Sequence, residues 1–256
     1  MIDRYERADR SAVGFSMDYP NGLASGMHSH RKAQLVYAIS GMMHVTTAEA
    51  SFLLPPTKAL FLPAEVEHSI CMEGDVAMRE VFMTRGLGEA IASAPRVLTV
   101  SPLLRELVLA ICQEPVDWPE QGRTPHLIAL IIEEIRRAKT VMTRLPQLRD
   151  PRLAPIARTI LDTPADPRTL EDWAEVCGAS ARTLARLFVQ DTGMTFGQWR
   201  LQARLNVAFI LLMTDGEIAL IAYKVGFASQ SAFGTAFRRT FGMTPAQART
   251  IHLDPA

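Results

Sequence analysis

The segment Leu170–Arg200, LEDWAEVCGASARTLARLFVQDTGMTFGQWR, is matched further along the chain by Ile218–Arg249, IALIAYKVGFASQSAFGTAFRRTFGMTPAQAR. With Ser180 aligned on Ser229, seven of 21 positions are identical. Self-similarity at a fixed offset indicates that one supersecondary unit occurs twice. The repeat therefore decides the architecture of the C-terminal part of the chain.

Each copy has the sequence pattern of a helix-turn-helix unit. A short helix leads to a glycine, Gly178 or Gly226, and then to a serine that can cap a second helix, Ser180 or Ser229. The second helix of each copy ends at another glycine, as helices commonly do. The apolar residues predicted to be buried are Leu184, Leu187 and Phe188 in the first unit and Phe233, Ala236 and Phe237 in the second. Both units are therefore expected to pack one face and expose the other.

The exposed faces carry side chains that can read DNA. They are Arg182, Ala185, Arg186 and Val189 in the first unit and Gln230, Ser231, Gly234, Thr235 and Arg238 in the second. Arginine pairs with guanine and glutamine with adenine, and short hydroxyl side chains can hold phosphates. The alternative is two helical hairpins with a solvated face. The duplication favours DNA, because a helix from about Thr195 to Met213 can set two recognition helices about 34 Å apart.

Composition and charge fit a soluble globular protein better than a polycation that coats nucleic acid. The 256 residues are 48% hydrophobic and 21% charged, and 27 basic residues balance 27 acidic ones. The segment from Arg168 to Arg249 contains nine basic and six acidic side chains, which gives it a net charge of +3. No apolar run approaches the roughly 20 residues of a membrane span, and the charged first residues do not resemble a signal peptide. We expect a cytoplasmic protein with reduced thiols at Cys71, Cys112 and Cys177.

The N-terminal part predicts a different fold class. From about Phe15 to Phe82, short apolar segments such as QLVYAI, HVTT, SFLL, ALFL and AMREVFM alternate with turn residues. This pattern is typical of an antiparallel β-sandwich or barrel. The predicted turns are Pro20-Asn21-Gly22, Ser40-Gly41, Pro55-Pro56, Pro63 and Glu73-Gly74-Asp75.

Two helices follow the predicted strands. The first is placed at about 103–111, with Ser101 as its cap, and the second at about 124–143. The second carries more apolar surface than one face needs, so it is buried within its own chain or contacts a second subunit as well. Prolines then mark a linker.

The residues of the repeat resemble the DNA-binding domain of the AraC/XylS family of bacterial transcription regulators. The first signature is Gly178 to Phe188 and the second is Ile218 to Phe241, followed by Gly242 and Thr244-Pro245. Thr235 stands where many members have arginine, and Ala248 replaces a frequent aromatic residue. The resemblance implies DNA contacts from Ala181, Arg182, Ala185, Arg186, Gln230, Ser231, Thr235, Arg238 and Arg239. It also implies a homodimer that binds double-stranded promoter DNA, a small-molecule effector and RNA polymerase, without membrane association.

The N-terminal region looks like a cupin barrel, the effector-binding domain of many such regulators. In metal-binding cupins an HxH pair is joined by a glutamate and a later histidine. Here His28 and His30 form the pair on one strand, Gln34 takes the glutamate place and His68 ends a stretch resembling the second motif, with Glu65 replacing its glycine. The expected effector pocket consists of His28, His30, Gln34 and His68. Three imidazoles suit Zn, Ni, Fe or Cu, and the alternative is a metal-free pocket for an organic effector.

The expected fold is therefore α+β in four parts. A cupin-like antiparallel β-barrel occupies residues 1–88, a helical dimerisation segment 89–143, a linker 144–154 and an all-α tandem helix-turn-helix domain 155–256. The predicted function is effector-controlled, sequence-specific DNA binding rather than catalysis. The alternatives are a metal-dependent cupin enzyme with a helical regulatory or assembly domain, and a structural helical adaptor. Glu65, Glu67 and Glu80 are acid–base candidates only by elimination, since a solvated setting is usual for glutamate.

Overall fold

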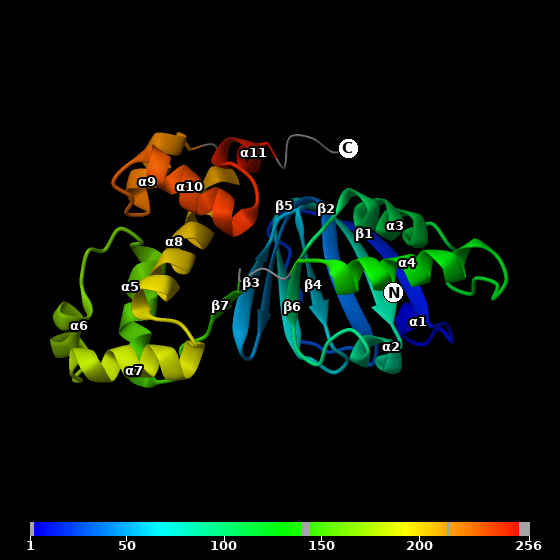
Figure 1. The fold of residues 1–256 in the computed structure, drawn as a ribbon, viewed down its shortest axis with the longest axis horizontal. Helices are drawn as coiled ribbons and strands as arrows, with labels where there is room; N and C mark the ends of the chain where they lie inside the picture. Colours follow the sequence, from blue (N-terminus) through cyan, green and yellow to red (C-terminus); the bar gives the residue numbers. More distant parts are fainter. Residues whose placement is uncertain (1–2, 140–143, 214–215, 251–256) are drawn as a thin grey trace. The chain divides into compact units, whose positions relative to one another are not determined.

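The computed structural model describes residues 3–139, 144–213 and 216–250, which form two compact units (Figure 1). The described part of the first unit is residues 3–47 and 52–139, and that of the second is 48–51, 144–213 and 216–250. The predicted barrel and most of the predicted helical segment thus belong to one unit. No helix in the described ranges is long and apolar enough to cross a membrane.

The first unit is built on an antiparallel sheet. Its elements are α1 (Asp3–Glu6), β1 (Ala12–Tyr19), β2 (Ala33–Thr47), β3 (Ala50–Leu54, of which residues 50–51 belong to the second unit), β4 (Lys58–Leu62), β5 (His68–Met83), α2 (Arg85–Glu89), β6 (Arg96–Thr99), α3 (Pro102–Cys112) and α4 (Arg123–Arg137). Strand β5 lies between β1 and β2, and β4 lies between β2 and β6. The described strand pairings do not close this sheet into the expected barrel. Helices α3 and α4 instead lie along the sheet and share its apolar core (Figure 1).

Two predicted turns proved to be irregularities inside long strands. Ser40-Gly41 lies within β2, where the register with β5 shifts between Ala38 and Met42, and Glu73-Gly74-Asp75 lies within β5. A β-bulge lets a strand bend and continue without reversing. Gly41 has a φ of 73°, and a side chain there would meet the Asp75 carbonyl oxygen at 2.3 Å. Glycine is therefore required by the bulge rather than by a turn.

The two predicted helices of the first unit are confirmed with shifted ends. Ser101 caps α3 by accepting from the Leu104 amide at 3.0 Å. Helix α4 ends at Arg137 rather than 143, and residues 140–143 lie outside the described ranges. Strand β6 was not expected in the helical segment; its four residues are too short to show a period in the sequence, and its pairing with β4 stabilises it.

The second unit is helical after a short extended segment. Its elements are β7 (Arg144–Pro146), η1 (Pro151–Leu153), α5 (Ala154–Asp162), α6 (Leu170–Val176), α7 (Ala181–Thr192), α8 (Phe196–Met213), α9 (Ile218–Lys224), α10 (Gln230–Phe241) and α11 (Pro245–Arg249). The predicted linker region thus includes regular structure, with Asp150 capping η1. Helix α8 joins the two repeats, as expected (Figure 1). The apolar core beside the first repeat includes Trp173, Phe188 and Trp199, the last of which belongs to α8. In the second repeat, an aromatic cluster forms between Phe209 of α8 and Phe237 and Phe241 of α10.

Candidate functional sites: two exposed helix faces and a histidine cluster

Serine caps set the start of the second helix in each repeat. The Ser180 hydroxyl accepts from the Thr183 amide and the Ser229 hydroxyl from the Ala232 amide, both at 3.2 Å. The helices α7 and α10 end at glycines in the left-handed conformation, with φ of 69° and 78°. Both helix-turn-helix units predicted from the repeat are therefore present with the expected caps.

The predicted DNA-contacting residues lie on the exposed faces of α7 and α10. Exposed side chains are Arg182, Ala185, Arg186, Gln230, Ser231, Thr235, Arg238 and Arg239, whereas Ala181 is half-buried. Opposite them, Leu184, Leu187, Phe188, Phe233 and Phe237 are buried, while Ala236, expected in the buried stripe, is only half-buried. Arg186 Nη1 donates to Gln190 Oε1 at 3.1 Å, one helical turn away. Each face thus presents donors and acceptors to solvent from a rigid helix.

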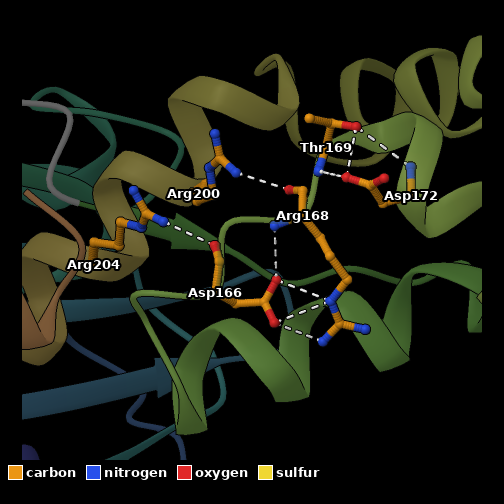
Figure 2. A network of polar contacts seen from close by, with 6 residues as sticks. All are labelled: Asp166, Arg168, Thr169, Asp172, Arg200 and Arg204. Atoms are coloured by element: carbon orange, nitrogen blue, oxygen red, sulfur yellow. Dashed lines mark hydrogen bonds and ion pairs between the residues drawn. The ribbon is translucent and has the colours of Figure 1, made fainter.

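A polar network fixes the loop that precedes the first repeat (Figure 2). Asp166 accepts from the Arg168 amide and guanidinium at 2.7 to 3.0 Å. The Arg168 guanidinium also lies over the Trp173 ring, 3.7 Å from its centroid. Arg200, from α8, donates to the Arg168 carbonyl at 3.0 Å. The loop is therefore tied both to α6 and to the long helix.

Arg204 connects both repeats to the same helix. Its guanidinium donates to the carbonyls of Pro164 at 2.6 Å, Asp166 at 3.0 Å and Gly226 at 3.4 Å. Gly226 has a φ of 80°, and a side chain there would meet Arg204 Cζ at 2.8 Å. The role of Arg204 was not predicted from the sequence. Its carbonyl partners lie 22 to 40 residues away, and nothing in the residues next to Arg204 indicates them. The Gly226 turn was the one clue to a close approach.

The histidine cluster lies in the first unit, where the two cupin-like motifs meet. An isolated bridge joins the backbone of His28 to that of His68, with N–H···O distances of 2.9 and 2.8 Å. The Glu65 amide donates to the His30 carbonyl at 2.7 Å. His28 and His30 were expected on one strand, but they lie in the segment before β2. The backbone hydrogen bonds between this segment and its neighbour form a single bridge at His28, which is too short to count as a strand. The bridge still brings all three rings together.

The three rings lie together, and the Nδ1 atom of each is engaged in a hydrogen bond. Their centroids are 4.4 to 5.4 Å apart, and one nitrogen of each lies within 4.8 Å of the others. The Nδ1 atoms of His28 and His68 donate to the carbonyls of Gly26 and Val66 at 2.8 and 2.9 Å, and that of His30 donates to the Glu6 carboxylate. Each Nε2 therefore carries a lone pair. Such outer hydrogen bonds orient metal-binding histidines in known sites.

Burial keeps two of the imidazoles neutral. Burial, with smaller contributions from the neighbouring rings of His28 and His30, lowers the pKa of His68 to about 4, against the hydrogen bond to the Val66 carbonyl, which raises it. Burial also lowers the pKa of His30, an effect that the Glu6 carboxylate opposes. Nε2 of both residues is buried and has no hydrogen-bond partner among the described residues. Unpaired buried acceptors are costly, and a cation removes that cost. The donor set therefore fits a divalent transition metal.

Gln34 does not stand alone beside the cluster. Its Nε2 donates to Glu80 Oε1 at 2.9 Å, and the two side chains are 2% and 1% exposed. The expectation of a solvated Glu80 was wrong, because β5 turns this residue into the interior of the sheet; Glu65 and Glu67 are exposed. Burial raises the pKa of Glu80 to about 8, against the hydrogen bond from Gln34. Glu65 has a φ of 63°, as expected where the motif has glycine.

Comparisons with known proteins agree with the helical repeat. A helix-turn-helix domain model matches residues 173–251. The HTH-type transcriptional regulator NimR of Escherichia coli K12 is 30% identical over 94% of this chain and 88% of that protein. The HTH-type transcriptional regulator RipA of Corynebacterium glutamicum is 42% identical over 83% of this chain, which spans 60% of its length. A solved AraC-type DNA-binding domain-containing regulator from Chromobacterium violaceum is 32% identical over 41% of this chain and 96% of that chain, with a TM-score of 0.39.

Proposed function

Because the chain belongs to the AraC family of HTH-type transcriptional regulators, we propose that it controls transcription by binding promoter DNA through α7 and α10 under the control of an effector bound in its first unit. The protein is a transcription regulator, as its relatives are named, and not a metal-dependent enzyme. The observation that carries the DNA proposal is the pair of capped, outward-facing helices joined by α8.

Helices α7 and α10 have different roles in the proposed contact with DNA. Arg182 and Arg186 lie one turn apart on α7, where they suit bidentate contacts with guanine in the major groove. Gln230, Ser231 and Thr235 on α10 are short or neutral, and Arg238 and Arg239 lie in its last turns. The second helix therefore contributes affinity through phosphates more than base reading. Ala181 and Ala185 allow α7 to approach the bases closely.

The effector site of the proposal is the histidine cluster and the side chains next to it. His28, His30 and His68 would hold a divalent zinc, nickel, iron or copper ion, supported by their clustered rings and by the two Nε2 atoms that lack partners. Such an ion would supply a Lewis-acid position to which an effector can attach. Glu6, from α1, orients His30 and makes the N-terminal residues part of the site.

A homodimer and a contact with RNA polymerase complete the proposal. Leu103 on α3 and Leu130 on α4 are 51% and 48% exposed, which supports subunit contact through the helices of the first unit. A dimer presents two copies of the tandem repeat to one promoter. Sedimentation of the wild type and of Leu130→Glu tests this part, since a shared apolar face predicts a dimer that the charge disrupts.

The experiment that tests the proposed function is selection of duplexes from a random pool by the full-length protein. We expect an enriched sequence that binds more tightly than random DNA at moderate salt. Arg182→Ala and Arg186→Ala should reduce that preference, while Arg158→Ala, exposed on α5, should not. Absence of any enriched sequence, or equal loss of preference in the α5 control, contradicts the proposal.

A further inference from the structure

A small cavity of about 60 Å³ lies beside the histidine cluster. Its polar lining comprises Tyr19, Ser25, His28, His30, Gln34 and Glu80. Its apolar lining comprises Leu23, Ile70, Met72 and Met78. A single water requires about 10–15 Å³ of such space, so the cavity has room for roughly four to six non-hydrogen atoms. The site is too small for a large organic ligand, and two of the three clustered histidines, His28 and His30, line it.

Two buried acceptors in this lining, Gln34 Oε1 and His30 Nε2, have no hydrogen-bond partner among the described residues. The Gln34 amide is held by its Nε2, which donates to Glu80 Oε1. Within the described ranges, no basic side chain forms an ion pair with Glu80. A buried acceptor held in one orientation loses about 1–3 kcal/mol when it stays unpaired, which favours a ligand that donates to it.

Gln34 also determines what the proposed metal can accept. An amide oxygen is a weaker metal ligand than a carboxylate, so glutamine at this position does not complete the coordination of a three-imidazole ion. Sites with three protein ligands keep a position open for an exogenous group. Gln34 thus leaves the position open and lies beside it with an unpaired oxygen.

We propose that this cavity binds the effector, a small oxygen-donor chelator that coordinates the ion held by His28, His30 and His68 and donates an N–H or O–H hydrogen bond to Gln34 Oε1. The inference rests on the metal of the proposed function and specifies the ligand class for that site. Glu80 acts as a positioning residue, since it holds the Gln34 amide with its oxygen toward the cavity. The apolar walls accept a short hydrocarbon part such as a methyl group.

The test uses the full-length protein loaded with Co²⁺, whose visible absorption reports its ligands. Acetohydroxamate, a chelator with five non-hydrogen atoms and one N–H, is the probe, and N-methylacetohydroxamate, which chelates in the same way without the N–H, is its control. We expect acetohydroxamate to change the cobalt spectrum of the wild type and to bind more tightly than the control. In Gln34→Met the preference between the two probes should fall about tenfold, as expected for one lost hydrogen bond, with cobalt affinity unchanged.

A second variant keeps the test decisive if Gln34→Met does not fold. Glu80→Leu removes the acceptor that holds the Gln34 amide, so it should also reduce the preference for acetohydroxamate. Glu67→Leu, an exposed change in the loop before β5, is the matched control and should behave as wild type. No cobalt uptake by the wild type overturns the metal of the proposed function together with this inference. Cobalt uptake with the same probe preference in wild type, Gln34→Met and Glu80→Leu overturns only the inference.

Discussion

Replacing Arg204 should loosen the two helix-turn-helix units from one another. Its guanidinium donates to Pro164 and Asp166 beside the first repeat and to Gly226 in the turn of the second. Hydrogen bonds from a charged donor contribute roughly 1.5–3 kcal/mol each. The side chain is half-buried and the Gly226 contact is long, so we expect Arg204→Ala to lower the free energy of unfolding by about 2–4 kcal/mol. Arg204→Lys has one compact donor group, which cannot reach both sides, and should lose about half as much.

The assay for this prediction combines unfolding with DNA binding. Urea unfolding of full-length wild type, Arg204→Lys and Arg204→Ala gives the stability change, with Arg158→Ala as an exposed arginine control. Fluorescence anisotropy then compares the selected duplex with duplexes in which one base pair is inserted between the segments read by α7 and α10. The wild type should reject the insertion, and Arg204→Lys should tolerate it better at a temperature where it is folded. An Arg204→Ala protein with wild-type stability and an unchanged spacing preference refutes the reasoning.

Three further predictions concern base reading, buried charge and the histidines. Arg186→Ala should cost about 1–3 kcal/mol on the selected duplex and little on random DNA; equal weakening on both, by anisotropy, would instead mark a phosphate contact. The pKa of Glu80 is about 8 in the fold against an ordinary 4.5; the folded state therefore keeps a proton that the unfolded chain has released, and in chelator-treated protein Glu80 alone should contribute a loss of about 1.4 kcal/mol of stability per pH unit between about pH 5 and 8, against the opposite contribution of His68, whose pKa is lowered. Urea unfolding across that range should show this slope in wild type relative to Glu80→Gln, and parallel curves would contradict it. Zinc should raise the melting temperature of wild type but not of His68→Ala, and an equal rise in both would exclude the cluster as the binding site.

The helical part of the fold was open to prediction from sequence because its signals are local. Ser180 and Ser229, the glycines that end α7 and α10, and the apolar stripes all act within one or two helical turns. Duplication then added a second, independent copy of the same pattern. The exposed faces followed directly, apart from Ala181 and Ala236, whose partial burial depends on neighbouring elements.

The sheet was less predictable because its details depend on distant partners. Gly41 reads as a turn residue, yet it occupies a bulge set by Asp75 and Val76 on the paired strand. Short alternating strands do not show whether a sheet closes into a barrel. Here helix α3 packs on β1, so closely at Gly14 that a side chain there would meet the Ile111 carbonyl oxygen at 2.5 Å. The contacts that decide these features lie tens of residues away in sequence.

The histidine cluster was predicted from the sequence in part: the meeting of its three rings was expected, and the contacts that fix them were not. The resemblance of the HxH pair and of the later histidine to cupin motifs predicted that His28, His30 and His68 lie together, and the structure brings them together. Their fixed Nδ1 donors could not be foreseen, because Glu6 reaches His30 from the N-terminal helix. Glu80 was placed wrongly, since glutamate is usually exposed and its burial here depends on Gln34 across the strand pair.

The most direct test of control by the histidine cluster is the dissociation constant for the selected duplex as a function of free Zn²⁺, measured on one preparation of full-length protein after metal removal. We expect the constant to change as zinc fills one site per chain and to return to its starting value on chelation, because a ligand that binds two arrangements of the first unit differently shifts their populations. His68→Ala should show a constant that does not respond to zinc. The same dissociation constant at every zinc concentration, with zinc bound to the wild type, would show that the cluster does not control DNA binding.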